Sequence, residues 1–264
     1  MAMSTAADKL SPVRLERDGS VATVWLDRPH KLNALDLEMR QALSAAFETL
    51  NDDPTIRAII VTGGDTVFAA GADLRLLADK SPSGVRDLGF AALWRPIADS
   101  TKPVIAAVAG YALGAGCELA LMCDIIVADS TAQFGQPECK VGVMPGAGGS
   151  QRLIRAVGKP VASLLLMTGG TLAAERAYQL GLVSELAEAG GCLEAARKIA
   201  SRIATMPPLA ISAIKQTLAN GADLPLPAAL ALENREFLLL FDTQDQKEGM
   251  AAFIEKRKPV FRGV

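Results

Sequence analysis

The chain has 264 residues, of which 50% are hydrophobic, and this is enough to bury the core of one sizeable domain. The formal net charge of -2 argues against a basic nucleic-acid-binding surface. No stretch reaches the roughly 18 consecutive apolar residues of a membrane-spanning helix, so no membrane association is expected.

The N-terminal segment, residues 1–12, is predicted to be a flexible leader because it lacks the apolar centre of a signal peptide. The 4 cysteines include no C-x-x-C pair, which favours a reduced, cytoplasmic protein without structural zinc.

His30 is the only histidine and lies in a predicted turn. Unless His30 itself is the base, this excludes Ser-His-Asp and Cys-His catalysis, and it argues against a histidine-ligated metal. Carboxylates remain as candidate acid–base groups, and no metal is expected.

The predicted elements, taken along the chain, indicate an α/β fold. Residues Val13–Arg17 and Val21–Asp27 alternate around Asp18-Gly19 as the strands of a β-hairpin do. Asp36 then has the position of a helix N-cap. Three short and wholly apolar strands follow, Ile56–Thr62, Val104–Val108 and Ile125–Ala128. Such strands, alternating with helical segments, indicate a largely parallel sheet that is buried on both faces.

A boundary is predicted near Pro207-Pro208, between a core of residues 13–206 and a helical region of residues 207–264. The helical region contains two predicted helices, Leu209–Leu218 and Ala228–Leu240. The run Leu238–Phe241 is too apolar for a free surface helix. It packs either between subunits or within the chain, and the sequence leaves both interpretations open.

Two predicted strands run into turns of small residues, Phe68–Leu74 and Gly110–Gly116. Small side chains let a ligand approach the backbone, and free N–H groups at a helix start attract negative charge. On neighbouring strands, the two turns would direct two N–H donors at one carbonyl oxygen. Each donor of such an oxyanion hole lowers a reaction barrier by roughly 3 kcal/mol. For either turn alone, tight helix–strand packing explains the small residues equally well.

Two glutamates lie beside glycine-rich turns in an otherwise apolar stretch, residues 104–143. Glu118 follows Gly114-Ala115-Gly116, and Glu138 precedes Pro145–Gly149. Two carboxylates in such surroundings are typical of acid–base chemistry on a neutral substrate. The alternative is that each glutamate caps a helix or pairs with an arginine. A nucleotide-binding Rossmann fold is the weaker candidate, because Leu119 stands where the dinucleotide-binding loop requires a third small residue.

Three segments closely resemble the enoyl-CoA hydratase/isomerase (crotonase) family: Phe68–Asp73, Gly110–Leu119 and Gln133–Leu153. The likeness extends from Arg28-Pro29 to Phe253–Arg257, which is essentially the whole chain after the leader. The resemblance implies a spiral of ββα turns and a C-terminal helical region that forms trimers, often paired into hexamers. It also implies an acyl-CoA thioester as substrate, with coenzyme A present only as part of that substrate and no permanently bound cofactor.

The resemblance also assigns roles to five residues. The backbone N–H groups of Ala72 and Ala115 would form the oxyanion hole, although the family usually has glycine in place of Ala115. Glu118 would act mainly as the base on a water that adds to C3, and Glu138 as the acid that protonates C2. The N–H of Gly146 would place the water. Because both glutamates are present, the sequence favours a 2-enoyl-CoA hydratase of fatty-acid or aromatic-acid degradation.

Residues near both ends of the chain are expected to bind coenzyme A: Lys31, Ala70, Asp73, Arg75, Phe253 and Lys256. The last two would reach in from the C-terminal helix, often across a subunit boundary. The alternative to coenzyme A binding is that the basic residues are ordinary surface charges and that Phe253 is a core aromatic.

Acyl specificity depends on the variable segment Leu76–Arg95, in which Trp94 lines the acyl pocket or lies in the core. Lys140, directly after Cys139, favours an acidic acyl tail, lowers the acidity needed of Glu138, or points to solvent. The form Gly114-Ala115-Gly116 is most similar to hydratases of aromatic degradation, such as those acting on dehydroadipyl-CoA. A short straight-chain enoyl-CoA is the more general expectation.

Two other functions stay open. An enoyl-CoA isomerase would work through Glu138 alone, without water. An RNA-binding role, known for a few family members, would require a basic stripe. The helix predicted over Glu194–Arg202 has only three basic residues, which suits a solvated face better.

Overall fold

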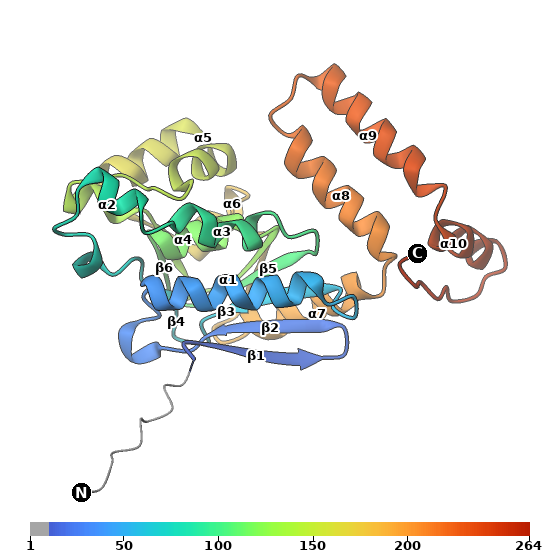
Figure 1. The fold of residues 1–264 in the computed structure, drawn as a ribbon, viewed down its shortest axis with the longest axis horizontal. Helices are drawn as coiled ribbons and strands as arrows, with labels where there is room; N and C mark the ends of the chain where they lie inside the picture. The colour runs from blue at the N-terminus through green and yellow to red at the C-terminus, as the bar shows by residue number, and fades with distance from the viewer. Residues whose placement is uncertain (1–10) are drawn as a thin grey trace, which may run out of the picture.

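The computed structural model describes residues 11–264, so all but the last two residues of the predicted leader lie outside the described part. Two sheets form the body of the molecule. One has 6 strands in the order β1-β2-β3-β5-β7-β10, and the other has 4 in the order β4-β6-β8-β9. Figure 1 shows helices α8, α9 and α10 projecting from this body. The predicted α/β class is confirmed.

The first sheet contains the predicted hairpin and the three predicted apolar strands. Its strands are β1 (Val13–Asp18), β2 (Val21–Leu26), β3 (Ala58–Thr62), β5 (Val104–Val108), β7 (Ile125–Asp129) and β10 (Glu185–Ala187). Strands β1 and β2 are antiparallel, and the remaining neighbours are parallel. The strand predicted from Ile56 begins at Ala58, because the backbone N–H of Ile56 bonds Asp53 in a turn at 3.2 Å.

Both faces of the first sheet are buried, as the apolar strands predict. Every residue of β3 and β5 is buried. Alternate side chains such as Ile60 and Ile105 pack against Ala196 and Ala200 of α7 (Cys192–Ala204). The other alternate set joins the main core together with Phe47 of α1 (Leu37–Asp52).

The second sheet consists of short strands, and the first three of them each follow a strand of the first sheet. They are β4 (Val67–Ala69), β6 (Tyr111–Leu113), β8 (Gln133–Gly135) and β9 (Thr171–Ala173). The units β3-β4, β5-β6 and β7-β8 run into a helical turn each: η2 (Leu74–Leu76), α4 (Ala115–Met122) and η3 (Pro137–Val141). This repeat is the predicted ββα spiral. Only the second unit leads into an α-helix, because the first and third end in short 3-10 helices.

The other helices of the body connect and cover these units. They are η1 (Pro29–Lys31), α2 (Pro82–Arg86), α3 (Phe90–Ala98), α5 (Gly149–Thr168) and α6 (Ala174–Gln179). Helix α1 begins where the sequence predicts, since the side chain of Asp36 accepts the N–H of Met39 at 2.9 Å. Helix α5 is kinked at Gly158, whose φ of 76° is outside the helical range.

The C-terminal helices are α8 (Pro208–Gly221), α9 (Leu226–Leu240) and α10 (Gln244–Ile254). The first two lie side by side and antiparallel, with α10 beyond them (Figure 1). Helix α8 is attached to the body by Lys215, whose ammonium group lies 2.8 Å from Asp124 Oδ2. No residue of α8 or α9 is buried. Leu238 and Leu239 are 61% and 60% exposed, so packing within the chain does not account for this apolar run.

No helix of residues 11–264 combines the length and the apolar character that a membrane crossing requires. The same residues contain no group of three or more His, Cys, Asp and Glu side chains arranged to hold a metal ion. The basic side chains of α7 are partly paired, since Arg197 lies 2.9 Å from Glu16 and Lys198 lies 3.8 Å from Glu194. This arrangement agrees with a solvated helix face.

Candidate active site

The two small-residue turns lie next to each other because β4 and β6 are parallel neighbours, with Ala69 opposite Ala112. Both turns require glycine because the backbone of each turn lies very close to that of the other. A Cβ on Gly71, whose φ is +114°, would lie 3.2 Å from the carbonyl oxygen of Leu113. A Cβ on Gly116 would collide with the carbonyl group of Ala69. The turns are therefore packed directly against each other.

Ala72 and Ala115 follow these contacts and offer two backbone donors. Ala115 is the first residue of α4, where an N–H group has no partner within the helix. Within residues 11–264, neither N–H group has a protein acceptor. Two unpaired N–H groups on adjacent turns are what an oxyanion hole requires.

The first of these turns is held by a segment whose role the sequence analysis missed. Asn33 is fully buried, and its side-chain nitrogen donates to the carbonyl oxygens of Val67 at 3.0 Å and Phe68 at 3.1 Å. Backbone bonds from Leu35 N to Gly71 O, 2.8 Å, and from Ala70 N to Leu32 O, 3.0 Å, extend the contact. The only feature of the sequence that pointed to this role was a single amide side chain, Asn33, between apolar residues.

Glu118 lies on α4 and is 3% exposed. Its Oε1 accepts the backbone N–H groups of Ala147 at 2.7 Å and Gly149 at 2.9 Å. Gly149 is the first residue of α5, so the glutamate does cap a helix start, as the alternative interpretation held. Oε2 has no donor among the described residues. One oxygen is thus fixed, and the other is free for a ligand.

Glu138 lies on η3 and faces the second turn. Its Oε1 is 3.0 Å from the position that a Cβ on Gly114 would take, directly before Ala115. Burial raises the pKa of Glu138, and the negative charge of Glu118 raises it further. A carboxyl group with a raised pKa is suited to donate a proton near neutral pH.

Gln136 is a second residue that the sequence analysis did not single out. It is fully buried, and with its amide nitrogen turned toward Glu138 it donates to both carboxylate oxygens, at 3.1 and 3.2 Å. A Cβ on Gly149 would collide with its amide group. The side chain therefore connects Glu138 with the start of α5, where Glu118 is held. The feature of the sequence that pointed to this role was the position of Gln136 in the Gly135–Glu138 motif.

The turn before α5 supplies the donors to Glu118. Arg152 holds it by donating to the carbonyl oxygen of Ala147 at 2.8 Å. Gly148 has a φ of +98°, and a Cβ there would collide with the Arg152 guanidinium. Gly146, the predicted water-positioning residue, is exposed and is not one of the two donors to Glu118. Its role stays a prediction.

The basic residues predicted to bind coenzyme A lie beside the first turn. Lys31 on η1 and Arg75 on η2 are exposed, and the bond between Leu32 and Ala70 joins the two segments that carry them. Asp73 caps η2, since its Oδ1 accepts the N–H of Arg75 at 3.0 Å. These placements leave both cations available at the rim of the site.

Phe253 and Lys256 are not brought to the glutamates within one chain. Phe253 is 86% exposed on α10, which Figure 1 shows on the far side of α8 from the body. Lys256 follows with a φ of 56°. Contact of either residue with coenzyme A at a neighbouring subunit stays a prediction.

Trp94 and Lys140 differ in placement. Trp94 is 5% exposed on α3 and belongs to the main core. Lys140 is exposed and runs along Gly169 at the end of α5, where a Cβ on Gly169 would lie 3.1 Å from Lys140 Cγ. This favours the interpretation that Lys140 points to solvent rather than into an acyl pocket.

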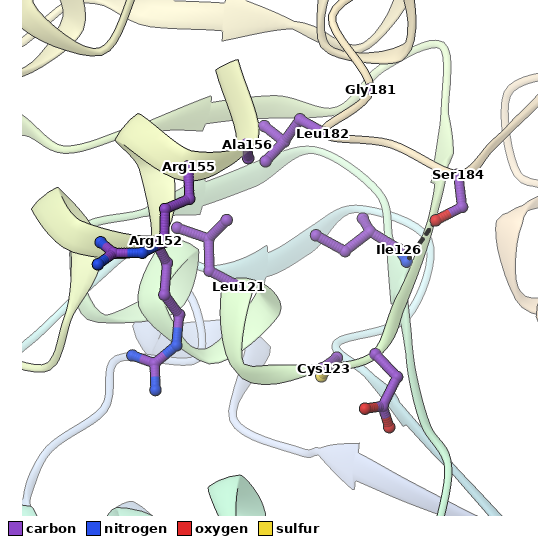
Figure 2. A pocket seen from close by; sticks show the side chains of 10 residues that line it. Leu121, Cys123, Ile126, Arg152, Arg155, Ala156, Gly181, Leu182 and Ser184 are labelled. Atoms are coloured by element: carbon purple, nitrogen blue, oxygen red, sulfur yellow. Dashed lines mark hydrogen bonds between the residues drawn. The ribbon is translucent and has the colours of Figure 1, made fainter. Parts of the chain in front are cut away.

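A hollow of ≈ 420 Å³ lies outside this site, at the opposite end of α4. Figure 2 shows Arg152 and Arg155 of α5 beside Leu121 of α4, with Cys123 where α4 ends. Asp124 at its edge pairs with Lys215 of α8. The hollow is lined by neither glutamate, and Arg155 at its edge pairs with Asp223, which follows α8.

Comparison with known proteins identifies the family. The sequence profile described as enoyl-CoA hydratase/isomerase matches residues 16–264. A protein of Mycobacterium tuberculosis named "Probable enoyl-CoA hydratase" is 47% identical over 249 residues, 94% of this chain and 97% of the relative. The 2,3-dehydroadipyl-CoA hydratase of Escherichia coli is 43% identical over 254 residues, 96% of this chain and all of the relative.

The fold agrees with this assignment. An enoyl-CoA hydratase subunit of Geobacillus kaustophilus superposes with a TM-score of 0.93 at 43% identity, covering 98% of this chain and 100% of that chain. The chain belongs to the enoyl-CoA hydratase/isomerase family, whose members act on coenzyme A thioesters. The predictions of a crotonase-type fold and of a hydro-lyase that hydrates enoyl-CoA are confirmed.

Proposed function

We propose that Glu118 and Glu138 together add water across the 2,3 double bond of a 2-enoyl-CoA thioester, giving the 3-hydroxyacyl-CoA. The observation that carries this proposal is the pair of carboxylates beside two unpaired backbone donors. Glu118 is fixed through one oxygen only, and Glu138 faces the turn that precedes Ala115.

The donors at Ala72 and Ala115 bind the thioester oxygen. Polarisation of the carbonyl group draws electrons from the double bond, so C3 becomes electrophilic and negative charge collects on oxygen. Because this charge is greatest in the transition state, the N–H groups stabilise that state more than the bound substrate. The methyl group of Ala115 leaves this chemistry intact, since the donor is the backbone.

The glutamates move the protons. The water oxygen bonds to C3 while Glu118 accepts the water proton, and Glu138 delivers a proton to C2. Gly146 helps to place the water. The raised pKa of Glu138 supports its role as the acid, and the two N–H bonds to Glu118 support its role as the oriented base.

Assembly completes the coenzyme A site in this proposal. The exposed apolar side chains of α9, with Leu238 and Leu239 among them, pack between subunits of a trimer or of a hexamer of paired trimers. Phe253 and Lys256 of one subunit then reach the coenzyme A of its neighbour, opposite Lys31 and Arg75. The working location is the cytoplasm.

The test is the loss of enoyl-thioester absorbance when purified protein is mixed with crotonyl-CoA. We expect Glu138→Gln to keep the fold and the affinity for coenzyme A but to lose at least roughly a hundredfold in kcat, the low end for general acid catalysis. Near-normal turnover by this variant would contradict the role of Glu138. An unchanged signal with wild-type protein would contradict the proposed substrate. A 3-enoyl thioester is the control, because an isomerase would convert it without water.

A further inference from the structure

Arg40 is an arginine in an unusual position. It lies on the inner side of α1 and is only 4% exposed. Its guanidinium carbon lies 4.3 Å from the ring centre of Phe90 and 4.7 Å from that of Trp94, which are neighbours on one face of α3. Nε donates to the carbonyl oxygen of Leu35 at 2.8 Å. This arginine therefore packs α1 against Phe90 and Trp94 of α3, which belong to the segment Leu76–Arg95 that is expected to shape the acyl pocket.

The terminal nitrogens of Arg40 have no hydrogen-bond acceptor among the described residues, and no carboxylate there lies within 4.0 Å of them. Its ring contacts are cation–π contacts, which use no N–H group. Trp94 repeats this pattern, because its Nε1 is buried and has no acceptor in the described structure. Two neighbouring side chains, each more than nine-tenths buried as a residue, thus both have N–H groups without a protein acceptor among the described residues, and of these Trp94 Nε1 is fully occluded.

Such groups are costly in a folded protein unless something binds to them. A buried charge without a close counter-ion and a buried N–H without an acceptor each lower stability. Burial lowers the pKa of Arg40 to about 10, so the side chain still carries its charge at neutral pH. Within the chain, Glu118 and Asp36 offset this only through charge at longer range.

Arg40 is also close to the reaction site. Leu35, whose carbonyl oxygen accepts Arg40 Nε, donates its own N–H to Gly71 O at 2.8 Å, directly before Ala72. The electrostatic interaction with Glu118 places the guanidinium near the catalytic base as well. An acyl chain that extends from Glu118 toward α3 would contact Arg40 and Trp94.

We propose that Arg40 and Trp94 form an anion subsite for the far end of the acyl group, so that the preferred substrate is a 2-enoyl-CoA ending in a carboxylate. The planar guanidinium presents paired N–H groups that match a carboxylate, and the indole N–H adds a third donor. This inference rests on the proposed hydratase function and specifies its substrate class.

The test compares two six-carbon thioesters, one 2-enoyl-CoA ending in a carboxylate and 2-hexenoyl-CoA ending in a methyl group. We expect kcat/KM of the wild-type protein to favour the carboxylate by at least about tenfold, the effect of a charge-assisted hydrogen bond. Arg40→Met, which keeps a long apolar side chain, should remove this preference while 2-hexenoyl-CoA changes little. Trp94→Phe keeps the ring and loses the N–H, so it should reduce the preference by less.

Binding separates this inference from the proposed reaction. Titration calorimetry with the saturated adipyl-CoA and hexanoyl-CoA needs no turnover, and adipyl-CoA should bind the wild-type protein at least about tenfold more tightly.

This preference in binding, without hydration of either enoyl thioester, would overturn the hydratase function but keep the subsite. Hydration without any preference would overturn the subsite alone. Equal losses on both substrates in Arg40→Met would make Arg40 a support of Glu118 or of the fold, and would also overturn the subsite. If Arg40→Met does not fold, Trp94→Phe and the wild-type binding ratio decide.

Discussion

The α/β body and the C-terminal helices are built on opposite principles. Strands β3 and β5 of the body have no exposed residue, whereas α8 and α9 have no buried one. Both regions are rich in apolar side chains. The body covers its own apolar residues with helices on both faces of a sheet, whereas many apolar side chains of the C-terminal helices stay exposed on the single chain. The body therefore contains the fold and the candidate site, and the proposed role of the C-terminal helices is assembly.

The largest effect on stability should come from the core of the body. Phe47→Ala removes a fully buried ring between α1 and the first sheet. The free energy of unfolding should fall by about 3–5 kcal/mol, as for other large-to-small changes in a core. Chemical denaturation measures this, and a loss below about 1 kcal/mol would mean that the core around α1 relaxes to fill the cavity.

A matching change in the C-terminal helices should affect assembly instead. Leu239→Asp places a charge on a side chain that is 60% exposed, so the fold of one chain should tolerate it. Light scattering should show smaller particles than for the wild-type protein. The KM for crotonyl-CoA should rise several-fold, because Phe253 and Lys256 would no longer reach a neighbour. An unchanged mass would contradict the role given to α9.

The smallest expected effect concerns the pH dependence of hydration. The N–H groups of Gln136 stabilise the ionised form of Glu138, so Gln136→Leu should raise the pKa of Glu138 further above its ordinary value. Glu138 acts in its protonated form, and activity falls as pH rises through this pKa. The alkaline limb of kcat/KM should therefore move to higher pH in the variant, with Gln133→Leu on β8 as the control. A shift to lower pH would contradict the Gln136 contact.

The strands and helices of the body were predictable because their patterns are local. Apolar runs predict buried strands, and Asp36 predicts a helix start. The glycine-rich turns predicted a pair of backbone donors for the same reason, since tight turns require glycine, and the family resemblance named Ala72 and Ala115 as the donors. The first turn was expected to enter a helix, and it ends in the short η2, because a run such as Leu74–Leu76 does not specify helix length.

Asn33, Gln136 and Arg40 could not be assigned roles from the sequence. Each depends on partners far along the chain: Asn33 on β4, Gln136 on the start of α5, and Arg40 on α3. A polar residue between apolar neighbours shows that something is bonded there, but it does not show which group. Lys140, by contrast, was a candidate from its position alone, and the structure places it along the end of α5.

The sequence by itself determined the family, the order of the spiral units and the two carboxylates, because motifs and periodicity are properties of short segments. Only the tertiary structure decided which oxygen of Glu118 is held, which amide contacts Glu138 and which buried donors remain without an acceptor. These are contacts between segments that meet only when the sheets and helices pack. They are set by distances across the fold rather than by spacing along the chain.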